Sequence, residues 1–231
     1  MKNFFFVWWV GAVILLLTTA SARADSLALV TDQAAQSADD SVPWSQLGSN
    51  GTSLPVSFDA NSIGGTTVSV ALTGPDSLLS VVCPSSACSW MGRGLPAGDS
   101  LLWTSDGHNG GNGPITLSFD DDVAGAGAFI QADSPAQFTA QIEAFDGATS
   151  LGSFSVTSDS TGQPLYIGVL DNSDANISSI VLTVSDSAGQ SMTDFAIDTL
   201  YLTSSAVAPP AAIPTATPTP KARRRRRRNH Q

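Results

Sequence analysis

The stretch QFTAQIEAF, residues 137–145, alternates apolar and polar side chains from Gln137 to Ala144 and decides the fold class. The apolar members are Phe138, Ala140, Ile142 and Ala144, and the polar members are Gln137, Thr139, Gln141 and Glu143. A period of two places the two sets on opposite faces of a β-strand, so the pattern predicts a strand with one face in a core. The turn sequence DGATS (146–150) follows, and it predicts a hairpin into LGSFSV (151–156).

Similar short segments rich in Val, Ile, Thr and Phe recur along the chain. They are LPVSF (54–58), TTVSVAL (66–72), LLSVV (78–82), LLWT (101–104), PITLSF (114–119), GAFIQA (127–132), LYIGVL (165–170), SSIVLTV (178–184) and FAIDTLYL (195–202). No longer window has convincing helical periodicity. We therefore expect an all-β fold, an antiparallel β-sandwich that is jelly-roll-like. One such domain with a single core is expected over residues 25–204.

The two ends of the chain differ from this body. Residues 1–24 have the order of a secretory signal peptide: a short positive start, the apolar run FFFVWWVGAVILLL (4–17), and an A-x-A pattern at Ala22 and Ala24. We expect cleavage after Ala24, and the alternative is an uncleaved N-terminal anchor. Residues 205–220 are rich in Pro, Thr and Ala and predict an extended linker. Residues 221–231 predict an arginine-rich disordered tail.

Charge is distributed very unevenly. Between Asp25 and Pro220 there is one basic residue, Arg93, against all twenty acidic residues, so this part carries a net charge of −19. The tail carries +7, from Lys221, Arg223, Arg224, Arg225, Arg226, Arg227 and Arg228. An acidic body of this kind lacks the lysines and arginines that phosphate contacts need, which excludes nucleic acid as an expected partner. It should attract cations.

The two cysteines, Cys83 and Cys88, lie close together in CPSSAC. In an exported protein the expected state of such a pair is a disulfide. The alternative is a metal site, which needs further ligands, and His108 is the only histidine of the body.

Enzyme chemistry finds little support in the sequence. His108 lies in the turn-forming stretch SDGHNGGNG (105–113), and there is no G-x-S-x-G motif around a serine. Glu143 is the only glutamate, and the body has no lysine. We therefore expect no catalytic residue and a non-enzymatic protein.

Two sets of side chains are candidates for binding. Asp120, Asp121 and Asp122 in FDDDV, with Asp198 in the apolar segment FAIDTLYL, have the oxygen chemistry of a structural calcium site. The alternative is a solvated acidic turn. Trp90 and Trp103 are candidates for stacking on a sugar ring, and the alternative is that they pack in the interior.

The arginine tail is expected to bind an anionic cell-surface polymer or lipid, or to fold onto an acidic body. The alternative is a solvated end without a partner.

Several stretches resemble a family of bacterial secreted proteins associated with the PEP-CTERM sorting tail. They are DSVPWSQLGSNGTSLPVSF (40–58), CSWMGRGLPAGDSLLWT (88–104), GNGPITLSFDDDVAGAGAFIQAD (111–133), FTAQIEAFDGATSLGSFSV (138–156), YIGVLDNSDANISSIVLTV (166–184) and DFAIDTLYL (194–202). The resemblance implies a jelly-roll module with no assigned activity. The tail departs from the family pattern because no apolar segment separates the prolines from the arginines. The mature chain is therefore expected to have no transmembrane segment.

Together these features predict a secreted β-sandwich module located outside the cell, at the cell surface or in the periplasm. It would bind a glycan or the extracellular matrix without catalysis. The alternatives are a purely structural surface protein tethered by its basic tail, and a secreted hydrolase of unrecognised type. The sequence does not indicate an oligomeric state.

Overall fold

Strand β10 (Phe138–Asp146) has the alternation that its sequence predicts: Phe138, Ala140, Ile142 and Ala144 are all fully buried. It forms a hairpin with β11 (Thr149–Thr157), paired from Thr139 opposite Thr157 to Asp146 opposite Thr149, with a register shift between Ala144 and Phe145. Gly147 occupies the turn with a φ of 54°, a left-handed conformation that glycine adopts without strain. The predicted hairpin is therefore confirmed.

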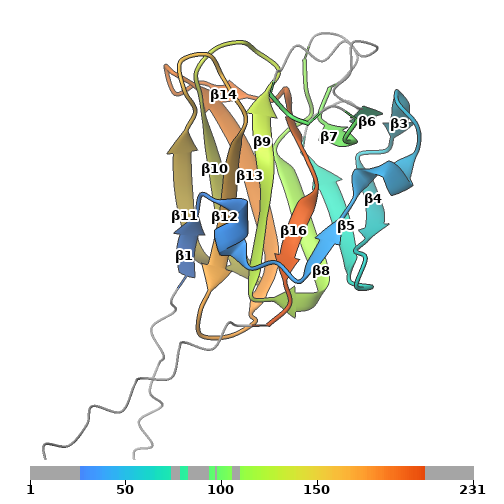
Figure 1. The fold of residues 1–231 in the computed structure, drawn as a ribbon, viewed down its shortest axis with the longest axis vertical. Helices are drawn as coiled ribbons and strands as arrows, with labels where there is room; N and C mark the ends of the chain where they lie inside the picture. Colours follow the sequence, from blue (N-terminus) through green and yellow to red (C-terminus); the bar gives the residue numbers. More distant parts are fainter. Residues whose placement is uncertain (1–26, 74–78, 83–93, 97, 106–109, 206–231) are drawn as a thin grey trace, which may run out of the picture.

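The computed structural model describes residues 27–73, 79–82, 94–96, 98–105 and 110–205. These residues form two antiparallel sheets that pack face to face (Figure 1). Sheet A has the order β1 (Leu27–Val30), β12 (Leu165–Asp171), β9 (Gly125–Ala132), β15 (Phe195–Ile197), β7 (Leu101–Trp103), β6 (Leu79–Val82) and β3 (Thr52–Leu54); β16 (Leu200–Thr203) also pairs with β9, and β2 (Asp40–Val42) pairs with β16. Sheet B has the order β11, β10, β13 (Ile177–Asp186), β8 (Ile115–Val123), β5 (Thr67–Leu72) and β4 (Ser57–Asn61), and β14 (Ser191–Met192) pairs with β13.

Eight of these strands pair in the nested manner of a jelly roll. Strand β10 pairs with β11, β9 with β12, β8 with β13, and β7 with β15, all antiparallel. Each successive pair encloses the previous one in the sequence, and the pairs alternate between sheet B and sheet A. This is the topology of two Greek keys wound around one core. The fold is an antiparallel, jelly-roll-like β-sandwich in a single domain, as the sequence predicts.

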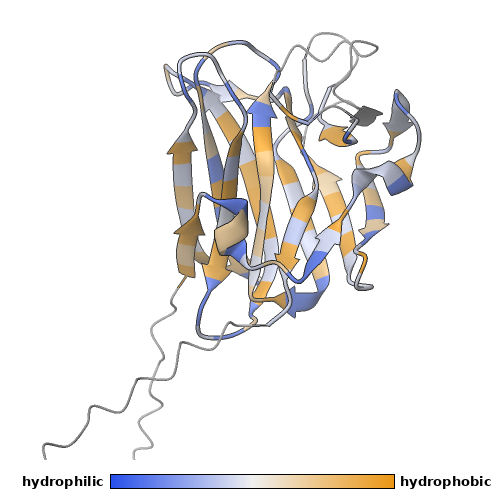
Figure 2. Ribbon diagram, viewed as in Figure 1, coloured by the Kyte–Doolittle hydropathy of each residue, from blue (hydrophilic) through white to orange (hydrophobic). Residues whose placement is uncertain are grey.

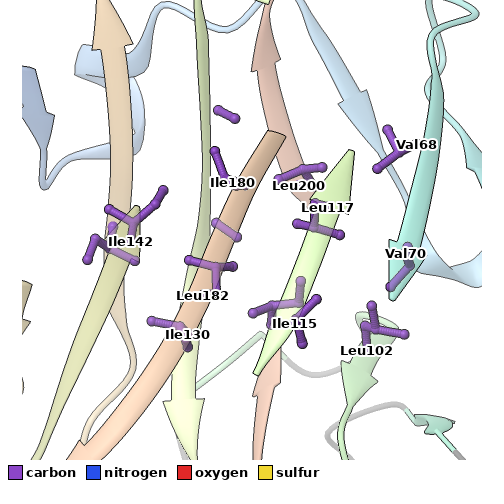
Figure 3. Close-up of a cluster of buried hydrophobic side chains, with 14 of the residues drawn as sticks. Val68, Val70, Leu102, Ile115, Leu117, Ile130, Ile142, Ile180, Leu182 and Leu200 are labelled. Atoms are coloured by element: carbon purple, nitrogen blue, oxygen red, sulfur yellow. The ribbon is translucent and has the colours of Figure 1, made fainter. Parts of the chain in front are cut away.

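The core lies between the two sheets. Figure 3 shows Ile142, Leu182 and Ile115 of sheet B beside Ile130, Leu200 and Leu102 of sheet A, and all six are fully buried. Full burial of an aliphatic side chain stabilises a protein by about 1.5–3 kcal/mol, so this layer is the main source of stability. Figure 2 shows the hydrophobic residues concentrated in the strands.

The structure differs from the sequence-based expectation in several elements. FAIDTLYL is two strands, because β15 ends at Ile197 and β16 begins at Leu200, with Asp198 and Thr199 between them. LPVSF is likewise divided between β3 and β4 at Pro55, which has no N–H to donate to a strand. Strands β1, β2 and β14 and two 3₁₀ helices, η1 (Gln33–Gln36) and η2 (Trp44–Leu47), were not expected.

Several predicted features lie outside the described residues: the signal peptide 1–24, the pair Cys83 and Cys88, Trp90, His108, and the segment from 206 to the end of the chain. Within the described ranges, no helix has the length and apolar character needed to cross a bilayer.

Candidate functional site

The outer face of sheet A carries a candidate binding site, a groove beside the segment η1–β2. Helix η1 lies against β12, β9 and β16. Its fully buried Gln36 holds it there: the side-chain amide donates to the Val169 carbonyl at 3.1 Å and to the Thr203 hydroxyl at 3.4 Å. In return Thr203 Oγ1 donates to the Gln36 carbonyl at 2.8 Å. This polar network fixes one wall of the groove on two strands at once.

Glycines make the close approach of η1 to the sheet sterically feasible. A Cβ at Gly168 would lie 2.5 Å from Gln36 Oε1 and 3.1 Å from the Ala126 carbonyl oxygen. A residue with a Cβ at this position would therefore displace the side-chain amide of Gln36. The small residues of GAGAF (125–129) and YIGV (166–169) thus leave room for η1 to pack against the sheet.

Three aromatic rings continue across the same face of sheet A. The Phe129 and Tyr166 centroids are 5.2 Å apart in an edge-on arrangement, and those of Tyr166 and Tyr201 are 6.2 Å apart. Burial raises the pKa of Tyr166 well above its usual range. The pKa of the half-buried Tyr201 is raised by burial and then by the charges of Asp198 and Asp99. Both phenols therefore stay protonated at physiological pH, and the Tyr201 hydroxyl remains a donor.

Tyr201 forms part of an open groove of about 490 Å³. The remaining walls come from η1 and the residues after it, from the start of β2, and from the loop at Ile63 and Gly64. Ile63 is 78% exposed, and it is the only exposed large hydrophobic side chain among the described residues. Its backbone N–H donates to the Ser41 carbonyl at 2.8 Å, which holds this loop against β2.

Two adjacent carboxylates line the groove in fixed positions. Asp39 Oδ1 accepts from the backbone N–H of Ser204 at 2.8 Å and from its hydroxyl at 3.0 Å. Asp40 Oδ1 accepts from the N–H groups of Ser41 and Gly64, each at 2.7 Å. Each carboxylate uses one oxygen for these bonds, and no donor among the described residues reaches the other oxygen. The groove therefore combines an aromatic ring, an aliphatic side chain and ordered acceptors.

The four aspartates predicted to bind calcium do not form one cluster. Asp120, Asp121 and Asp122 are exposed within the last part of β8 in sheet B, not in a loop, and Asp120 Oδ1 accepts from the Thr67 N–H at 2.8 Å. Hydrogen bonding from Thr67 lowers the pKa of Asp120. Asp198 lies in the connection between β15 and β16 of sheet A and is 4% exposed. The described residues contain no group of three or more His, Cys, Asp or Glu side chains placed to hold a metal ion.

Asp198 has an acidic neighbour instead. Its Oδ1 accepts from the Thr199 N–H at 2.7 Å, and the Asp99 carboxyl lies within hydrogen-bonding reach. Burial raises the pKa of Asp198, and the charge of Asp99 raises it further. Asp99, Trp44 and Thr199 line a small cavity of about 160 Å³ beside this pair.

Trp103, one of the two tryptophans predicted to stack on a sugar, is only 7% exposed. It packs with Leu95, Leu101 and Ala196, and its indole N–H donates to Asp194 Oδ1 at 2.6 Å. A ring this buried offers no face to a sugar, so the structure gives Trp103 a packing role. The sequence analysis did not single out Tyr201, Asp39 or Asp40, because a lone tyrosine and two adjacent aspartates match no motif.

Comparison of the chain with protein-family models, with curated proteins and with solved structures finds no match.

Proposed function

We propose that this protein is an exported, non-enzymatic β-sandwich module that binds a carbohydrate in the groove beside Tyr201. The groove itself is the observation that carries the proposal. Its volume of about 490 Å³ accommodates a sugar residue or two, and such volumes are usual for small-molecule sites. Export is supported by the signal pattern of residues 1–24.

The chemistry of the groove suits a sugar better than an apolar ligand. The half-buried Tyr201 ring can pack against the C–H face of a pyranose, and its protonated hydroxyl can donate to a ring or hydroxyl oxygen. Asp39 and Asp40 can accept hydrogen bonds from sugar hydroxyls, because each has an oxygen that no described donor occupies. These carboxylates are held by backbone donors, so little ordering is needed on binding.

The test is binding of the full-length secreted chain to a panel of insoluble polysaccharides and soluble oligosaccharides. Tyr201→Ala should weaken binding roughly tenfold by removing the stacking face. Phe154→Ala is the matched control, because Phe154 is a half-buried aromatic residue on β11 of the opposite sheet. Both variants are compared at equal folded fraction, measured by thermal unfolding.

Three results would count against the proposal. These are an absence of binding across the panel, equal weakening by both variants, and release of reducing sugar from the same polysaccharides. The last would replace a binding module by a hydrolase.

A further inference from the structure

The described part of the chain has no basic side chain at all, while it contains seventeen acidic ones. Seven of the ten lysines and arginines of the whole sequence lie in residues 221–228. The carboxylates of the groove therefore have no cationic partner among the described residues. The segment 221–228 is the one concentrated source of positive charge in the sequence.

The chain leaves the described domain at the groove. Ser204 is hydrogen bonded to Asp39 through both its backbone N–H and its hydroxyl, at 2.8 and 3.0 Å. Only the fifteen residues 206–220 separate Ser205 from Lys221. Fifteen residues span about 50 Å when fully extended and about 45 Å in the extended polyproline conformation, and ten of the fifteen are not proline, so the linker can bend between its prolines. The basic segment can therefore reach a groove whose edge lies at its own point of attachment.

The groove contains the three kinds of partner that an arginine side chain uses: carboxylate oxygens, an aromatic ring and an aliphatic side chain. The guanidinium can bond to the outer oxygens of Asp39 and Asp40 and stack on the Tyr201 ring. Its aliphatic arm can cover Ile63, which is otherwise 78% exposed. The exposed triplet Asp120–Asp122 also has charge, but it lies along a strand of sheet B and none of its residues lines the groove.

We infer that the basic segment 221–228 docks into the groove of its own chain, with arginines paired to Asp39 and Asp40 and packed against Tyr201. Docking within one chain benefits from the raised effective concentration of a segment tethered to its own binding site. The segment would then occupy the groove until a ligand or an anionic surface displaces it. This inference concerns the chain alone and stands whether or not the groove binds sugar.

The test compares backbone amide chemical shifts of the full chain with those of a variant in which Arg223–Arg228 are all glutamine. At an ionic strength of about 20 mM, the shifts should differ at Ser37, Ser41 and Gly64, which border the groove. Asp39→Asn with Asp40→Asn should remove most of this difference, because asparagine keeps the Oδ1 acceptor but not the charge. About 0.5 M salt should remove it as well.

Asp121→Asn with Asp122→Asn is the matched control, since it neutralises two adjacent exposed carboxylates on sheet B and should leave the chemical-shift difference intact.

The absence of a shift difference between the wild type and the glutamine variant would overturn the inference. Shift differences spread over the whole body would also overturn it. So would an equal loss of the shift difference in the two double Asp→Asn variants, because the attraction would then be diffuse. Groove shifts that grow with protein concentration, with dimers in sedimentation, would assign the groove to a second copy and overturn docking within one chain. No carbohydrate is present in any arm, so failure here is independent of the proposed binding function.

Discussion

Asp198 shows how a single buried acid makes stability depend on pH. It is 4% exposed, it faces Asp99, and burial followed by the charge of Asp99 raises its pKa above the ordinary value of 3.8. Below that value the group is protonated in both folded and unfolded states and contributes nothing. As the pH rises through the raised pKa, the folded state must carry a charge that it disfavours, and stability falls.

Asp198→Asn should therefore raise the unfolding temperature near pH 7, and the gain should shrink towards about pH 4. Asparagine keeps the acceptor for the Thr199 N–H and resembles the protonated acid. Thermal unfolding of both proteins across this pH range measures the effect.

Asp159 provides a control of opposite sign. Hydrogen bonds from the Gln163 backbone N–H and from the Thr161 side chain lower its pKa. Its stabilising effect is thus present above its ordinary pKa and lost as the pH falls, so Asp159→Asn should lower the unfolding temperature near neutrality. If Asp198→Asn behaved in the same way as Asp159→Asn, the account of Asp198 would be wrong.

At the scale of elements, the sequence predicts strands where alternation is long and fails where tertiary contacts make the element. The nine residues of β10 and the turn at Gly147 carry their own signal. Helix η1 has only four residues and no apolar periodicity, and the contact that places it, from Gln36 to Val169, spans 133 positions. The groove depends on that contact, which is why the sequence pointed to tryptophans and an aspartate cluster instead of Tyr201.

The docking of η1 through Gln36 leads to a stability prediction. Gln36→Leu should destabilise the protein by about 1–3 kcal/mol, because the Val169 carbonyl and the Thr203 hydroxyl lose a buried partner. Gln33→Leu, on the same helix at a half-exposed position, should change stability by less than about 0.5 kcal/mol. Urea unfolding measures both. Equal effects would show that Gln36 does not anchor the helix.

At the scale of the whole molecule, the dominant fact is the separation of charge between body and tail. A body with a net charge of −19 repels itself, and this repulsion opposes the compact state. The tail carries +7 and is joined to the body beside the Asp39–Asp40 pair. A tail close to the body offsets part of the repulsion in the folded state, whereas in the unfolded chain the same charges are spread further apart.

The glutamine variant of Arg223–Arg228 should therefore melt a few degrees below the wild type at about 20 mM ionic strength, which for a domain of this size corresponds to about 1 kcal/mol. At about 0.5 M salt both proteins should gain stability and their melting temperatures should converge, because screening removes the repulsion and the attraction together.

Calorimetric scans at the two ionic strengths measure this difference in melting temperature. Replacement of the same arginines by lysine is the control that keeps the charge. A glutamine variant as stable as the wild type at low salt would mean that the tail does not act on the body at all. A lysine variant as unstable as the glutamine one would instead show that the guanidinium groups themselves, beyond their charge, hold the tail in place.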